Sequence, residues 1–105
     1  MTRTPTHPGA ILAEELQERG ITASEAARAL HVPTNRVTQI LKGERAITAG
    51  TALRLARWLG TSAEMWLNLQ TLYELRLAEQ KEGAEIQRTV PQVAGIREGA
   101  LLPQQ

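Results

Sequence analysis

The segment 34–42 carries polar side chains whose chemistry suits the edges of base pairs. Asn and Gln can form paired hydrogen bonds with an adenine edge, and Thr can reach a base or a thymine methyl group. Lys can reach guanine or a phosphate group. None of the residues on this predicted outward face is acidic, and the face consists of Thr34, Asn35, Thr38, Gln39 and Lys42.

Two short helices joined by a tight turn would position this face. The first begins at Thr22, because Thr22 and Glu25 have the spacing of a capping box, in which each side chain satisfies a free backbone N–H of the other residue. Pro33 ends it, since proline has no N–H to donate and disfavours helical geometry in the residue before it. The small Ala27 is expected where the two helices cross. Most units of this type have glycine in the turn; here His31 occupies that place, and we expect a positive φ angle with slight strain.

The second helix is predicted over residues 34–41, with an inward apolar stripe of Val37, Ile40 and Leu41. A helix about 10 Å across fits the major groove of DNA. The two helices therefore match a helix-turn-helix unit whose recognition helix is 34–41. An ordinary helical hairpin with a solvated polar face is the alternative interpretation.

Composition limits the class of protein. A chain of 105 residues suits one domain with a single core. It has no cysteine, so we expect a reducing, cytoplasmic environment and neither disulfides nor a thiolate metal site. No stretch approaches the roughly 20 apolar residues of a membrane span, and the amino terminus lacks the apolar core of a signal peptide.

Charge is concentrated in the middle of the chain. The net charge is only +1, but residues 28–57 contain six basic side chains against one acidic side chain, a local balance of +5. The segments 1–27 and 58–105 each carry −2. A basic centre between acidic flanks indicates one face that binds phosphate groups and another face with a different role. Chance clustering of charges on solvated helices gives the same pattern. Arg45, just after the predicted recognition helix, could reach the DNA backbone or be an ordinary surface arginine.

Three more helices complete the predicted all-α domain. One runs from Pro8 to about residue 19, a second over 49–59 after the cap Thr48, and the longest over about 63–80. Thr61 and Glu64 repeat the capping-box spacing and are predicted to start the longest helix. We expect a loose segment 1–6, a domain over 7–83 and a tail over 84–105 that is disordered, packed on the domain or folded on a partner.

The longest helix has more apolar residues than one face can hold. The surplus is best buried by a second copy of the chain, and a two-fold dimer would place two recognition helices about 34 Å apart to read a palindrome. The alternative is that Trp58 and Trp66 fill a monomer core and the leucines are scattered on the surface. The predicted dimer interface consists of Trp66, Leu69, Leu72, Tyr73 and Leu75.

Residues for catalysis are missing. The chain has no aspartate, and its histidines, His7 and His31, lie in a terminus and a tight turn. Ser24 and Ser62 lie at helix starts, where serine is usually structural. No glycine-rich phosphate loop, nucleophile–base pair or metal-ligand spacing occurs, so we expect no enzyme, cofactor, metal or small-molecule substrate.

Five blocks of the sequence form a pattern when they are taken together. They are His-Pro-Gly-Ala-Ile-Leu at 7–12, the helix-turn-helix, Gly-Glu-Arg-Ala-Ile-Thr at 43–48, Thr-Ala-Leu-Arg-Leu-Ala at 51–56 and Trp-Leu-Asn-Leu-Gln at 66–70. With these blocks the chain resembles the HigA-type antitoxins, a branch of the lambda-repressor/Cro-like (XRE) helix-turn-helix proteins. The resemblance covers roughly residues 7–80 and leaves the tail unexplained. It implies a five-helix lambda-repressor-like domain with a long fifth helix and an irregular C-terminal tail.

The resemblance implies a bacterial antitoxin that dimerises, represses its own operon at a palindromic operator and binds a HigB-type toxin, an mRNA endonuclease of the RelE-like fold. Toxin binding rests on the resemblance alone. Ala23 and Pro33 depart from the glutamine and the serine or threonine that the superfamily often has at these places, which affects operator choice or affinity. The implied DNA-reading residues are Thr34, Asn35, Thr38 and Gln39, with Arg36, Lys42 and Arg45 as partners of the DNA backbone.

Two other functions stay open at this point. One is a solitary transcriptional regulator of the same fold without a toxin. The other is a protein-binding module that inhibits its partner without useful affinity for DNA. A toxin-sized open reading frame beside the gene and a DNA-binding assay would separate the three.

Overall fold

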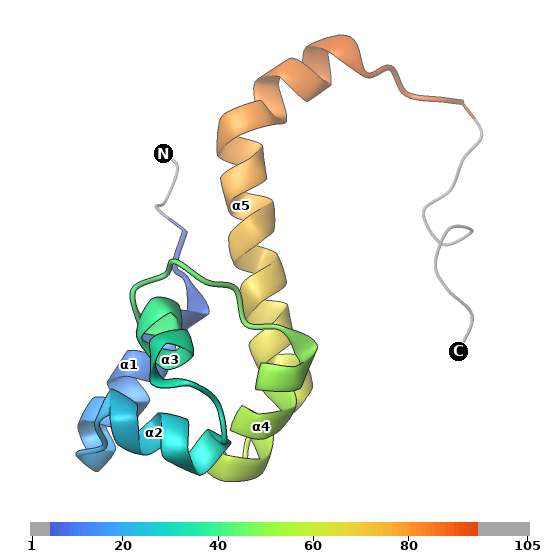
Figure 1. Ribbon diagram of the computed structural model, residues 1–105. Coiled ribbons are helices and arrows are strands. Elements are labelled where there is room, and N and C mark those ends of the chain that lie inside the picture. The colour runs from blue at the N-terminus through green and yellow to red at the C-terminus, as the bar shows by residue number, and fades with distance from the viewer. Residues whose placement is uncertain (1–4, 95–105) are drawn as a thin grey trace.

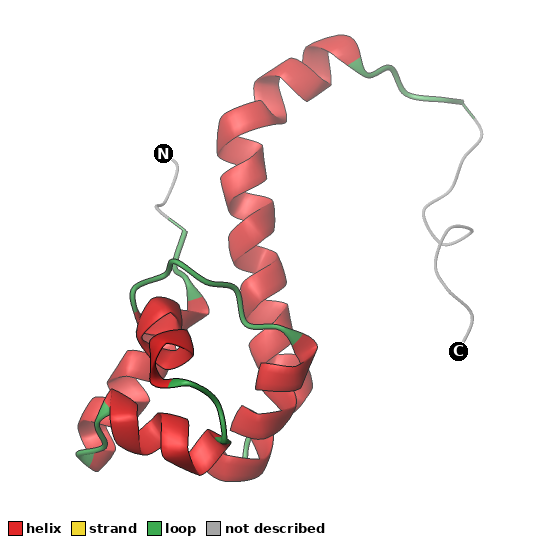
Figure 2. Ribbon diagram, viewed as in Figure 1, coloured by secondary structure: helices red, strands yellow, loops and turns green. Residues whose placement is uncertain are grey.

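The computed structural model describes residues 5–94 and consists there of helices joined by short loops (Figure 1). Figure 2 shows no strand in this part of the chain. The predicted all-α class with a long fifth helix is confirmed. The helices are α1 (Pro8–Arg19), α2 (Ala23–Leu30), α3 (Thr34–Leu41), α4 (Ala49–Leu59) and α5 (Ala63–Thr89).

The starts of α1 and α2 follow local capping chemistry. The Nδ1 atom of His7 accepts the backbone N–H of Gly9 at 2.8 Å and caps α1. The predicted capping box of α2 is confirmed, because Thr22 Oγ1 accepts the Glu25 N–H at 3.1 Å and Glu25 Oε1 accepts the Thr22 N–H at 2.9 Å. The bond from the Thr22 backbone also lowers the pKa of the Glu25 carboxyl group.

The core lies where α1 to α4 pack together with the first part of α5, which runs along one side of the other helices (Figure 1). Trp66 is its largest member and is 1% exposed. Apolar residues from all five helices and from the loop before α4 pack there, which joins the helix-turn-helix to α5 through one continuous cluster. Its fully buried members are Leu12, Leu16, Ala26, Ala27, Leu30, Val37, Ile40, Ile47, Ala52, Leu55 and Trp66.

Glycine is required where α1 meets α3. A Cβ atom on Gly9 would overlap the backbone carbonyl oxygen of Ile40, and no side-chain movement could relieve that overlap. The closeness lets the first turn of α1 lie directly on the last turn of α3. The recognition helix is therefore fixed to the rest of the domain by backbone contact as well as by side chains.

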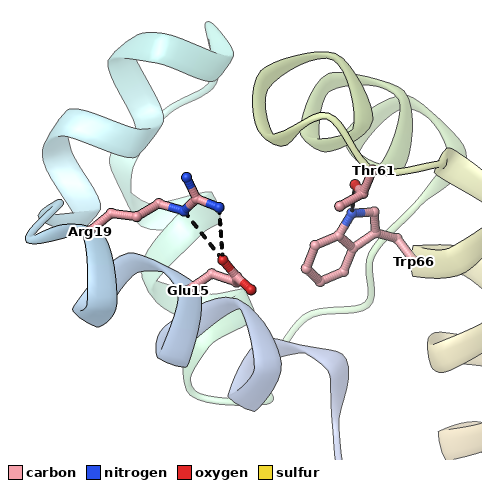
Figure 3. Close-up of polar contacts among 4 residues, drawn as sticks. All are labelled: Glu15, Arg19, Thr61 and Trp66. Carbon is pink, nitrogen blue, oxygen red and sulfur yellow. Dashed lines mark hydrogen bonds and ion pairs between the residues drawn. The ribbon is translucent and has the colours of Figure 1, made fainter.

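The prediction that Thr61 caps α5 is wrong. The N-cap is Ser62, whose Oγ atom accepts the Met65 backbone N–H at 3.0 Å. Thr61 Oγ1 instead accepts the indole N–H of Trp66 at 2.8 Å (Figure 3). A buried indole N–H needs an acceptor, and this requirement of the core decides the role of Thr61.

The long helix extends further than the sequence predicted. It runs through the segment 84–89, which was assigned to the irregular tail, and ends at Thr89. Pro91 sets this end because it keeps the preceding residue, Val90, out of helical geometry. The rest of the expected tail, 95–105, lies outside the described residues, as do residues 1–4. No helix in the described part is long and apolar enough to span a membrane.

Candidate nucleic-acid interface

The predicted helix-turn-helix is present as α2 and α3. His31 ends α2 with φ 59° and ψ 46°, the left-handed conformation expected where most such turns have glycine. Ala27 is 2% exposed, which fits its predicted place at the crossing of the two helices. The unit therefore has the geometry that its sequence pattern requires.

Helix α3 separates a buried stripe from a polar face. Val37 and Ile40 are buried, and Leu41 is half-buried against the core. Pro33 occupies the N-cap position and provides no side-chain hydrogen bond. This is expected, because proline stands where the superfamily often has a serine or threonine. On the polar side, the exposed or half-buried residues are Thr34, Asn35, Arg36, Thr38, Gln39 and Lys42.

Two of the predicted DNA-binding residues bind each other. The Nε atom of Arg45 donates to Gln39 Oε1 at 2.7 Å. The chain can return to Gln39 within six residues because Gly43 turns it with φ 75°. With Oε1 occupied, the Nε2 donors of Gln39 remain for an acceptor such as adenine N7, and the outer guanidinium donors of Arg45 remain for phosphate. Local patterns treated these two residues separately and missed the pair.

The loop that carries Arg45 is held from α5. The buried N–H of Ile47 donates to Gln70 Oε1 at 2.9 Å, and Gln70 Nε2 donates to Glu74 Oε2 at 2.9 Å. Gln70 is only 6% exposed. No sequence pattern assigned a role to Gln70. The available signal was its position four residues after Trp66, which places a polar group on the inward face of α5.

His7 lies beside the same loop. Its ring meets Tyr73 edge-on, with centroids 4.8 Å apart. Burial lowers the pKa of His7, while a hydrogen bond with the backbone of Arg45 and the charge of Glu74 act in the opposite direction. The net lowering favours the neutral ring, which is the form whose Nδ1 atom can accept the N–H of Gly9.

The basic residues of the segment 28–57 do not all face one surface. Arg54 Nη1 donates to the carbonyl oxygen of Leu30 at 2.8 Å and closes the end of α2. Arg54 and Arg57 line a groove between α2 and α4. The positive charge beside α3 therefore comes from Arg36, Lys42 and Arg45. Among residues 5–94, no group of three or more His, Cys, Asp or Glu side chains could hold a metal ion.

The residues of the predicted dimer interface differ in their exposure. Trp66 cannot belong to an interface, because it is buried in the core of its own chain, as the alternative interpretation held. Leu69 and Tyr73 are half-buried, whereas Leu72 and Leu75 are 48% and 51% exposed. Beside them, a groove of about 340 Å³ runs between α5 and the segment before α1 and is lined by Pro5, Thr6, Ile11, Leu69, Leu72, Tyr73 and Arg76.

Comparison with known proteins identifies the class. A helix-turn-helix family model (HTH_3) matches residues 12–66, and the chain belongs to this family of DNA-binding proteins, which is not an enzyme class. The resemblance to HigA-type antitoxins is confirmed, because similar proteins and similar solved structures include HigA antitoxins.

The chain is similar to the following three proteins, among others. Virulence-associated protein I of Dichelobacter nodosus is 52% identical over 75 residues, which are 70% of this chain and 69% of that protein. An addiction module antidote protein of the HigA family from Coxiella burnetii has a TM-score of 0.84 and 50% identity, covering 87% of this chain and all of that chain. Pseudomonas aeruginosa antitoxin HigA, solved with the higBA promoter, has a TM-score of 0.82 and 40% identity, covering 85% and 98%.

Proposed function

We propose that this protein is the antitoxin of a toxin–antitoxin module. As a dimer it binds a palindromic operator and represses its own operon, and it neutralises a HigB-type mRNA endonuclease by direct binding. The observation that carries the DNA-binding half is the polar face of α3, on which Arg45 already orients Gln39. The solved structure of Pseudomonas aeruginosa antitoxin HigA with the higBA promoter supports the same assignment.

Base reading and backbone binding should separate by mutation. We expect Asn35→Ala and Gln39→Ala to weaken operator binding by about 1–3 kcal/mol, mainly at particular base pairs, because each removes amide hydrogen bonds to a base edge. Arg45→Ala should weaken binding to every sequence and flatten the salt dependence, because it removes a partner of the DNA backbone. It should also lower discrimination between sequences, because it releases the amide of Gln39. Fluorescence anisotropy with operator variants at several salt concentrations measures both effects.

Arg88→Ala is the matched control, because Arg88 is an exposed arginine near the far end of α5 and pairs only with Glu85 at 3.4 Å among the described residues. It removes the same charge without touching α3. If Asn35→Ala and Gln39→Ala leave the sequence preference unchanged, α3 is not the recognition helix. An equal loss with Arg88→Ala would mean that total charge, and not position, governs binding.

Dimerisation follows from the exposed apolar residues of α5. Leu72 lines the groove between α5 and the start of the chain with α1, and the exposed Leu75 follows three residues later on α5. We infer that a second copy covers this surface, because large apolar side chains clustered on one face favour burial. A two-fold pair would present two copies of α3 to successive turns of one DNA face, about 34 Å apart.

We propose that the toxin binds an acidic surface of this chain. The exposed face of α1 carries Glu14 and Glu18, which form no salt bridge among the described residues. Glu15 is already paired with Arg19 at 3.1 Å (Figure 3), so it offers less charge to a partner. Beyond Ala78, α5 adds further glutamates, of which Glu79 and Glu85 are in ion pairs. A basic ribonuclease would complement either surface.

Co-expression tests the antitoxin assignment. The neighbouring open reading frame alone should arrest growth, and co-expression with this chain should relieve the arrest and yield a complex that purifies as one species. Glu14→Lys with Glu18→Lys should then weaken the complex if α1 forms the interface. Glu82→Lys with Glu85→Lys makes an equal charge change on α5, so the pair of substitutions that weakens the complex identifies which of the two surfaces binds the toxin. A harmless neighbour that does not bind would leave a solitary DNA-binding regulator.

A further inference from the structure

We propose that Gln70 is a positioning residue for operator recognition: from the buried face of α5 it fixes the loop 42–48 so that Arg45 can orient Gln39. This inference rests on the proposed binding of operator DNA. It assigns a role in sequence discrimination to a residue that faces the core and lies on a different helix from α3.

The first step is the buried hydrogen bond. Ile47 is 2% exposed, so its N–H cannot be satisfied by bulk water and needs a partner in the protein. Gln70 Oε1 accepts it at 2.9 Å across 23 residues of sequence. Gln70 Nε2 donates to Glu74 Oε2 at 2.9 Å, so both ends of the amide are satisfied and its orientation is fixed.

The segment 45–47 of the loop has few restraints of its own. Within residues 5–94, the backbone of segment 45–47 forms no hydrogen bond with another backbone group outside the helices. Arg45 and Ala46 are exposed. The position of Arg45 therefore depends on its flanks. On one side the Glu44 N–H donates to the Gln39 carbonyl oxygen at 2.8 Å, and on the other side the Ile47 N–H donates to Gln70. The backbone of Arg45 also contacts His7.

The third step links the loop to the base-reading face. Arg45 Nε holds Gln39 Oε1 at 2.7 Å, which leaves the amide nitrogen as the outward donor. Without this bond the amide could rotate and present either its oxygen or its nitrogen to a base. Loss of the loop anchor should therefore reduce discrimination between operator and other DNA more than it reduces overall affinity.

The test compares operator and random DNA for the full chain and the Gln70→Met variant. Methionine keeps the length of the side chain but cannot accept the Ile47 N–H. We expect operator affinity to fall about tenfold, while affinity for random DNA changes less than about twofold. In an Arg45→Ala background, Gln70→Met should change operator affinity by less than about twofold, because the link to Gln39 is already broken.

Two controls separate positioning from general stability. Leu16→Val removes a core methylene near the end of α1 that is far from His7, and at matched stability it should keep wild-type discrimination. Glu74→Gln preserves an acceptor for Gln70 Nε2 and should also keep wild-type discrimination between operator and random DNA. If Gln70→Met does not fold, Glu74→Leu, which releases the Gln70 amide from the helix surface, should lower discrimination by a smaller factor.

The outcomes are distinct. Unchanged discrimination in the Gln70→Met variant, or in Glu74→Leu where the first does not fold, overturns the inference and leaves the proposed function intact. The same loss with and without Arg45, or an equal loss in Leu16→Val, also overturns it. A wild-type chain that does not prefer operator over random DNA overturns the proposed repressor function itself.

Discussion

Replacing Gly9 with alanine should destabilise the folded chain by about 3 kcal/mol or more, the upper end of what overpacking costs. The new Cβ atom would overlap the carbonyl oxygen of Ile40, and both groups belong to helices that are held in the core. Either α1 or the end of α3 must move. Because domains of this size are stable by only about 5–15 kcal/mol, urea unfolding should show a large fall in midpoint.

Gly50→Ala provides the control for this substitution. Gly50 is also helical, but a Cβ atom there would meet nothing within 4 Å. The change should therefore be neutral or stabilise the chain by up to about 1 kcal/mol. A Gly9→Ala variant that unfolds at the wild-type midpoint would show that α1 and α3 are not in backbone contact.

The double substitution Leu72→Lys with Leu75→Lys should give a folded monomer. Both side chains are about half exposed, so their replacement removes little core packing. Two linked recognition helices gain affinity because the second half-site is bound at a high effective concentration, and losing that link should lower affinity for the full palindrome by about 10²–10⁴-fold. Affinity for an isolated half-site should stay near the wild-type value.

Sedimentation and operator titration measure this effect together. Leu53→Lys is the matched control, because Leu53 is 64% exposed but lies on α4, away from the groove beside Leu72. It should leave both the oligomeric state and operator affinity unchanged. A wild-type chain that is monomeric at high micromolar concentration would contradict the proposed dimer.

Local sequence patterns predicted most of the fold. The capping box at Thr22, the glycine stops and the apolar stripe of α3 each depend on residues a few positions apart, so the ends of α1 to α4 followed from the sequence. The same reasoning misplaced the cap of α5, because Thr61 and Ser62 both suit that position and the demand of the Trp66 indole decides between them.

The site was only partly predictable for a related reason. The polar face of α3 follows from helical periodicity, but its pre-arrangement depends on contacts that periodicity does not describe. Arg45 reaches Gln39 through a turn, and Gln70 reaches Ile47 from another helix. Trp66 was assigned to an interface because composition shows how many apolar residues a helix has, whereas packing decides which of them the core takes.

Selection can act separately on the two ends of α5. From Ala63 to Gln70 its inward side chains share the core with α1 to α4, so substitutions of those side chains are constrained by their neighbours. From residue 79 to residue 94, every residue except Gly83 is exposed, and the ion pairs Arg76–Glu79 and Glu85–Arg88 each join residues three positions apart. Mutations can therefore accumulate in this projecting half with little effect on the core that holds α2 and α3. Under the proposed antitoxin function, a toxin-binding surface on this half would be free to diverge among related chains while operator choice stays fixed.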